Sequence, residues 1–198
     1  MSTPIKAFLH PPNVLSSLSY KASLQKIRLS TTDIDSILKS LAKHPFILSA
    51  TFHKILTNAL CTTSRIKNHP TLACFACGKS RDDLYHFLRC PHVAFIFKLP
   101  PAFGSLHKSY FSPNTLAKLA VFFETYYIVT KQYGPTFFKS NFEFVATKTA
   151  GIARQVAIKN KLLYLSQLPH ISDNAVSEFV YTQQHPAYTC NVLDAALM

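Results

Sequence analysis

The feature that most constrains this chain is a group of three cysteines and one histidine within 17 positions, spaced C-x2-C-x8-H-x3-C. The four side chains are Cys74, Cys77, His86 and Cys90. Two cysteines at this spacing can place both thiolates on one tetrahedral ion, and Gly78 supplies the backbone freedom of a knuckle turn. We expect a helix to follow, capped by Ser80 or Asp82. In such a helix His86 and Cys90, four positions apart, share one face.

Three thiolates and one imidazole are the donors that Zn²⁺ prefers, and four protein ligands leave no open position for an activated water. The sequence therefore predicts a structural zinc site. Other residues could replace one of these four ligands. His92 lies two positions beyond Cys90, and Cys61 or His69 could fold back onto the ion.

The composition favours a folded intracellular protein. The chain has 198 residues, 48% of them hydrophobic, which is enough for a real core and argues against a disordered basic tail. The best apolar run, 119–129, is too short to span a membrane and contains Glu124. No secretion signal marks the N-terminus, and the cysteine count is odd, so we expect a reducing compartment, the nucleus or the cytoplasm.

The periodicity predicts a mostly α fold, a helical domain with an embedded CCHC zinc knuckle and no strand. Apolar spacing predicts helices over 32–41, with Thr32 as N-cap, and over 46–60. Two longer helices are expected over 114–133, ended by Gly134-Pro135, and over 140–168, closed by Pro169. The segments are then 1–30, a poorly ordered lead-in; 31–98, the helices with the zinc module; 99–170, the C-terminal helices; and 171–198, a tail.

Charge is lopsided, with 21 Lys and Arg against 9 Asp and Glu, a net of +12. The stretch 36–81 has no acidic residue, and its basic residues are Lys39, Lys43, Lys54, Arg65, Lys67, Lys79 and Arg81. With Phe46, Phe52 and Phe75 interleaved, this stretch can track a phosphate backbone while an aromatic ring stacks on a base. The alternative is that these aromatics belong to the core and the cations form a solvated face.

The run from Phe52 to Ile66, followed by the Cys74-x2-Cys77-Gly knuckle and Asp83-x2-His86-Phe-Leu-x-Cys90-Pro, resembles a known family. It is similar to the zinc-binding region C-terminal to the polymerase in non-LTR (LINE-type) retrotransposon reverse transcriptases. The resemblance covers about a quarter of the chain. It implies a nucleic-acid-handling accessory module, with the two knuckle cysteines, His86 and Cys90 as ligands. The chain differs from many members in having three residues, rather than four, between His86 and Cys90, and in lacking Trp.

No catalytic constellation is expected. A polymerase holds two Mg²⁺ ions on adjacent aspartates in an apolar hairpin plus a distant third, whereas Asp82-Asp83 precede a predicted helix and suit helix capping. Cys61 and Cys190 each have a histidine nearby in the sequence, as a catalytic Cys-His pair would require. Neither pair has a third residue to orient the histidine, so we interpret both as incidental thiols. Four glycines, none paired at phosphate-loop spacing, argue against nucleotide hydrolysis.

The leading hypothesis is therefore a non-catalytic, zinc-binding module that binds RNA or DNA without sequence preference and in a salt-sensitive way. One alternative is a zinc-stabilised protein-interaction domain that docks a partner through the 114–133 helix, whose aromatic pairs are Phe122, Phe123, Tyr126 and Tyr127. Such aromatics are more often core. A decayed retroelement fragment is the third hypothesis.

Overall fold

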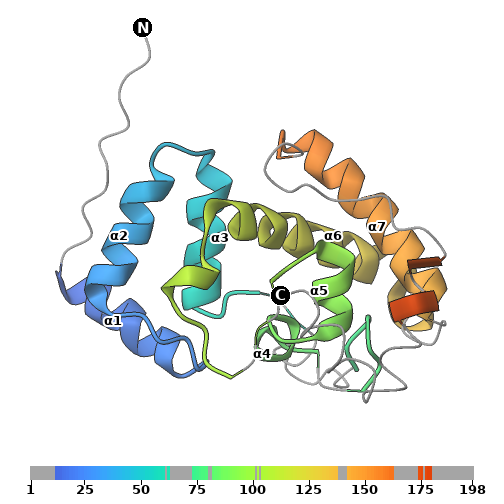
Figure 1. Cartoon of the computed structure of the whole chain (residues 1–198), viewed down its shortest axis with the longest axis horizontal. Helices are drawn as coiled ribbons and strands as arrows, with labels where there is room; N and C mark the ends of the chain where they lie inside the picture. Colours follow the sequence, from blue (N-terminus) through green and yellow to red (C-terminus); the bar gives the residue numbers. More distant parts are fainter. Residues whose placement is uncertain are drawn as a thin grey trace, which may run out of the picture.

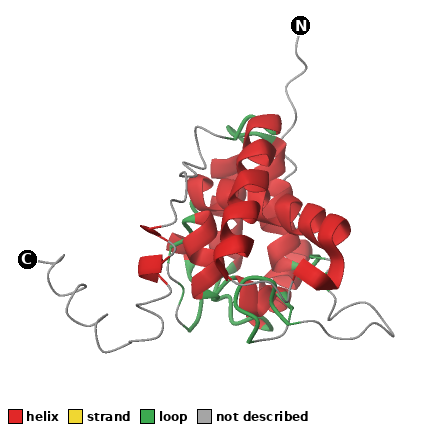
Figure 2. Cartoon of the chain, turned by 90° about the vertical axis from the view of Figure 1, so that its right-hand side faces the viewer, coloured by secondary structure: helices red, strands yellow, loops and turns green. Residues whose placement is uncertain are grey.

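The computed structural model describes residues 12–60, 62, 73–79, 82–100, 102, 104–137, 142–162, 174–175 and 177–179. These residues are mostly α-helical, as the periodicity predicts, and contain helices and loops but no strand (Figure 2). An isolated parallel bridge joins Ile27 to Leu106. No helix among the described residues is both long enough and apolar enough to cross a membrane.

Three N-terminal helices pack on one another at one end of the molecule (Figure 1): α1 (Pro12–Ser23), α2 (Thr31–Leu41) and α3 (Phe46–Leu56). Helix α1 lies in the segment expected to be a poorly ordered lead-in, so the structure differs from that expectation over residues 12–23. Leu18 and Ala22 of α1 are buried, and Val14 packs against the same core. Their four-residue spacing was the signal for this helix.

The N-cap of α2 is Ser30, not Thr32 as expected. The Ser30 hydroxyl accepts a hydrogen bond from the Asp33 N–H at 3.1 Å, and the Asp33 carboxylate accepts one from the Ser30 N–H at 3.1 Å. This reciprocal capping box satisfies two of the free amides at the start of the helix. Helix α3 begins at the expected residue and ends four residues earlier than expected, at Leu56.

Helix α6 (Pro113–Phe137) crosses the centre of the molecule and contacts α3, α5 and α7 (Figure 1). It continues beyond its predicted end at Gly134-Pro135. Helix α7 (Phe142–Lys159) packs along α6 and ends at Lys159, well before Leu168. Residues 163–173, with the predicted stop Pro169, lie outside the described residues, as does most of the 171–198 tail.

Two short helices, α4 (Leu84–Phe87) and α5 (Pro91–Phe97), lie beneath α6 in the view of Figure 1. Large aromatic side chains join them to α6. Phe122 of α6 is fully buried, and its ring centroid lies 5.2 Å from that of Phe87 and 5.1 Å from that of Phe97. The core is therefore continuous from α6 into the cysteine segment, and Phe122 stands at the junction.

Candidate metal centre

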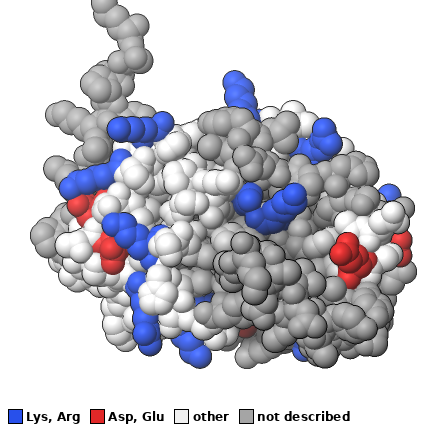
Figure 3. Space-filling view, viewed as in Figure 1, with Lys and Arg blue, Asp and Glu red and all other residues white. Residues whose placement is uncertain are grey.

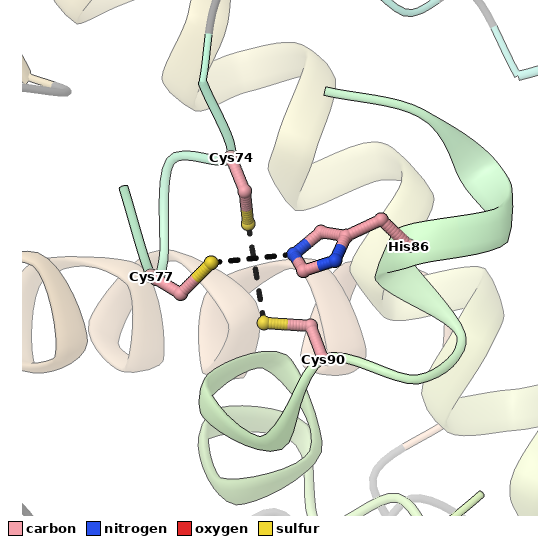
Figure 4. Close-up of side chains that lie close together, drawn as sticks. All are labelled: Cys74, Cys77, His86 and Cys90. Carbon is pink, nitrogen blue, oxygen red and sulfur yellow. Dashed lines mark hydrogen bonds between the residues drawn. The ribbon is translucent and has the colours of Figure 1, made fainter. Parts of the chain in front are cut away.

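The first two cysteines lie on a tight turn. The Gly78 N–H donates to the Cys74 carbonyl at 2.8 Å, which closes the turn around Cys77. Gly78 has a φ of +65°, in the left-handed region that a residue with a Cβ rarely adopts. The turn thus has the backbone that the Cys-x2-Cys-Gly pattern predicts, and both thiols face the same side (Figure 4).

The other two donors come from two helices, not one. His86 is on α4, which has four residues, and Cys90 is the N-cap of α5, with Pro91 at the first helical position. The prediction that His86 and Cys90 share one helix face is therefore wrong. Pro91 was the signal, because proline favours the first position of a new helix. The N-cap of α4 is Asp83, whose carboxylate accepts from the His86 N–H at 2.7 Å, and not Ser80 or Asp82.

The four donor side chains converge on one point (Figure 4). One ligand atom from each of the four lies within 4.8 Å of the others. The Cys74 and Cys90 sulfurs are 4.0 Å apart, and the Cys77 sulfur lies 3.3 Å from His86 Nε2. All three cysteines are free thiols, and two of them, Cys74 and Cys90, are buried. This group can hold a metal ion.

The donors strongly perturb one another's pKa values. Hydrogen bonds with Cys74 and Cys90 hold the pKa of Cys77 far below its usual value, while hydrogen bonds with Cys77 and Cys90 raise the pKa of Cys74. Burial by itself lowers the pKa of His86, but hydrogen bonds to Cys77 and Cys90 outweigh burial and raise it to about 10. Because a metal ion takes deprotonated thiols and a neutral imidazole as ligands, its binding to these four side chains releases protons.

Two buried contacts fix the knuckle to α6. Asp82 is fully buried, and its carboxylate accepts a hydrogen bond of 2.5 Å from the Tyr126 hydroxyl. Phe75, inside the knuckle, lies 6.0 Å from Tyr126 and 6.3 Å from Phe122 between ring centroids. Sequence reasoning missed the Asp82 contact, because a buried carboxylate and its partner 44 positions away leave no local pattern.

Arg89 ties the same segment to the end of α1. Its guanidinium donates to the carbonyl oxygens of Gln25 at 3.2 Å and Gly104 at 2.9 Å, and it stacks on the Tyr85 ring, 4.0 Å from the centroid. These bonds are all to backbone oxygens or an aromatic face. Arg89 therefore acts as a structural clamp between α4 and the loop that follows α1.

Of the three alternative ligands, the structure describes His92, and His92 does not join the group. His92 packs its ring on Phe142, 4.6 Å between centroids, and is not among the clustered donors. Burial lowers the pKa of His92. Cys61 and His69 lie outside the described residues, and so do Cys190 and the histidine near it in the sequence, His185.

The predicted nucleic-acid-binding residues are spread over several elements. Lys39 and Lys43 are exposed at the end of α2, Lys54 is exposed on α3, and Lys79 is exposed in the knuckle. Lys39 forms an ion pair of 2.6 Å with Asp35. The remaining three, Arg65, Lys67 and Arg81, lie outside the described residues.

On the face shown in Figure 3, the Lys and Arg side chains of the described residues do not form one dense patch. They are scattered along the surface, and some have acidic side chains beside them. Of the interleaved aromatics, Phe52 and Phe75 are core residues, whereas Phe46 is 80% exposed. The core alternative therefore holds for Phe52 and Phe75 and not for Phe46.

Comparisons with family models, with curated proteins and with solved structures found no match to this chain.

Proposed function

We propose that this chain is a non-catalytic module in which a structural Zn²⁺ holds the cysteine segment in place and an excess of basic side chains binds nucleic acid. The observation that carries the proposal is the convergence of Cys74, Cys77, His86 and Cys90 on one point. The four ligands come from a turn, a short helix and a helix N-cap, so one ion would fix three pieces of local structure at once.

The donor set fits zinc in chemistry and in size. Zn–S bonds of about 2.3 Å and Zn–N bonds of about 2.0 Å at tetrahedral angles place neighbouring donors about 3.5–3.8 Å apart. The distances here, 4.0 Å between the Cys74 and Cys90 sulfurs and 3.3 Å from the Cys77 sulfur to His86 Nε2, bracket that range. Three soft thiolates disfavour Mg²⁺ and Ca²⁺, which take oxygen ligands.

Binding of nucleic acid is supported by the net charge of +12 and by the acid-free stretch 36–81. The resemblance of the knuckle to the region C-terminal to LINE-type reverse transcriptases points the same way. In this proposal the chain supplies no polymerase chemistry. The two aspartates beside the knuckle have structural contacts instead, Asp83 as a helix cap and Asp82 with Tyr126.

Fluorescence anisotropy with a labelled single-stranded oligonucleotide tests the proposal. We expect binding that weakens steeply between 50 and 200 mM salt, because each neutralised phosphate releases counterions. Reversing two charges, Lys39→Glu with Lys43→Glu, should reduce both the affinity and the salt dependence. The control reverses Lys21 and Arg28, which are exposed on and after α1, and so matches the change in net charge. Absence of binding at low salt, or equal losses in both variants, would contradict the proposal.

The protein-interaction alternative has less support from the burial of its aromatic residues. Phe122, Phe123 and Tyr126 are at most 7% exposed, so three of the four side chains of the suggested docking face are core. Tyr127 is the exposed member, at 60%. This one exposed ring is the starting point for the next inference.

A further inference from the structure

A groove with a volume of about 410 Å³ lies between α3 and α6. Phe123 and Tyr126 of α6 contribute buried aromatic surface to it, and Ile47 and Leu60 contribute apolar surface from α3 and the residues after it. Lys54, Glu124 and Tyr127 also line it. Its size is within the range of small-ligand sites, about 300–1,000 Å³.

Tyr127 is the unusual side chain of this groove. Helix α6 buries Phe122, Phe123 and Tyr126, yet Tyr127 is 60% exposed. An exposed aromatic ring at the edge of an apolar groove offers a flat face to a planar partner.

Lysine side chains lie near the Tyr127 ring and can pair with negative charge on such a partner. Lys54 lines the groove, and Lys131 holds its ammonium group 5.8 Å from the centroid of the Tyr127 ring. The carboxylate among the described lining residues, Glu124, is held by Lys159 of α7 at 3.0 Å and by the amide of Asn160, just after α7, at 2.8 Å. The charge available to a ligand in the groove is therefore positive.

An aromatic face flanked by cations is the combination that binds single-stranded nucleic acid, in which bases stack on rings and phosphates follow the positive charge. A duplex keeps its bases stacked on one another and cannot present one to Tyr127. An acidic peptide would use the lysines but gains little from the face of the ring.

We infer that the groove between α3 and α6 binds single-stranded nucleic acid, with one base stacked on Tyr127 and the neighbouring phosphates near Lys54 and Lys131. This inference rests on the proposed function and adds to it a surface, a strandedness and an anchoring side chain.

The chain offers a matched control on another helix. Phe144 of α7 is 44% exposed, and Lys148 holds its ammonium group 5.9 Å from the Phe144 ring centroid. The pair Phe144 and Lys148 thus repeats the i, i+4 arrangement of Tyr127 and Lys131, and Phe144 is not among the residues that line the groove.

The test measures the affinity of the full chain for a labelled 12-nucleotide oligo-dT strand at 50 mM salt. The proteins compared are the wild type, Tyr127→Ala, Tyr127→Phe and Phe144→Ala, each checked for unchanged helicity. We expect Tyr127→Ala to weaken binding about tenfold, because the variant lacks the ring on which one base stacks. Tyr127→Phe keeps the ring and should bind like the wild type, as should Phe144→Ala. The affinity for a duplex of the same length should change little in every variant.

Three other results are informative, and each leads to a different conclusion. If the wild type binds the strand and Tyr127→Ala binds it equally well, the groove is not the site, while the proposed function stands. If Phe144→Ala weakens binding as much as Tyr127→Ala, the effect is not local to the groove and the inference is overturned. If the wild type binds no strand, the proposed function and this inference both fail.

Discussion

The three N-terminal helices and the cysteine segment 73–99 are stabilised in different ways. Helices α1, α2 and α3 have 11 or 12 residues each and bury apolar stripes against one another. Helix α2 also begins with a capping box. The cysteine segment has helices of four and seven residues. One turn of helix cannot persist alone, because nucleation fixes several residues for each hydrogen bond gained.

This difference indicates which region a bound metal ion would stabilise. The N-terminal helices have enough apolar contact to keep their places when the cysteine site changes. The cysteine segment depends on two things, the aromatic contacts to Phe122 and the joining of Cys74, Cys77, His86 and Cys90. Changes at the donors should therefore act on one region, whereas changes in the shared core should act on both.

Metal removal should have the largest effect and should separate the two regions. Structural zinc sites contribute apparent binding free energies of about 10–16 kcal/mol in small peptides, and that energy is coupled to folding. We expect a chelator to speed amide hydrogen exchange over 73–99 by orders of magnitude, and to change exchange in α2 and α3 far less. Exchange measured by mass spectrometry on peptides from both regions is the readout.

The comparison fails if both regions lose protection together. Equal acceleration in α2 and in the cysteine segment would mean that the molecule unfolds as one unit when the metal leaves. Unchanged exchange throughout would mean that packing alone holds the knuckle.

Phe122→Ala changes the core that the two regions share and should therefore destabilise both of them. Its ring is fully buried between Phe87 and Phe97, so truncation leaves a cavity at the junction of α6 and the cysteine segment. Loss of a buried Phe costs about 3–5 kcal/mol. Urea unfolding followed by circular dichroism should show this loss. The exposed Phe144→Ala is the control, and a loss as small as the control's would place the junction elsewhere.

Tyr126→Phe tests the polar link between the same two elements. It removes the hydroxyl that donates to the buried Asp82 carboxylate and leaves the ring in place. Hydrogen bonds to charged groups contribute about 1.5–3 kcal/mol, so we expect a loss of about that size together with weaker metal retention in competition with a chelator. The exposed Tyr127→Phe serves as control. Unchanged metal retention in Tyr126→Phe would show that Asp82 does not position the knuckle.

Ser30→Ala should have the smallest effect and should act on the N-terminal helices alone. It breaks the capping box of α2, in which the Ser30 hydroxyl accepts from the Asp33 N–H. Loss of such a cap costs about 1 kcal/mol. Urea unfolding should detect this loss, while metal retention stays at the wild-type value. Ser40→Ala in the same helix, away from its N-terminus, is the comparison, and reduced metal retention in Ser30→Ala would contradict the separation of the two regions.

Local patterns in the sequence predicted much of this architecture. The donor spacing identified the four residues that converge, and apolar periodicity located α2, α3, α6 and α7. The errors arose where two local signals competed. The i, i+4 spacing of His86 and Cys90 favoured one helix carrying both residues, whereas Pro91 marks the start of a second helix, α5. In α6 the pair Gly134-Pro135 did not end the helix.

Features that depend on distant residues could not be predicted. The contact between Asp82 and Tyr126 joins positions 44 apart, and the groove between α3 and α6 exists only once those helices pack. Burial also decided which aromatics reach solvent. Tyr126 and Tyr127 are adjacent in the sequence, yet one is 2% and the other 60% exposed, because the helix turns one toward the core.

The most direct test of the account is the zinc content of the purified protein by elemental analysis. The proteins to compare are the wild type, the double variant Cys77→Ser with His86→Ala, and His53→Ala, which removes an exposed histidine of α3. The account predicts one zinc per chain in the wild type and in His53→Ala, and none in the double variant. A wild-type protein without zinc, or a double variant that keeps it, would contradict the central claim that these four side chains form a structural zinc site.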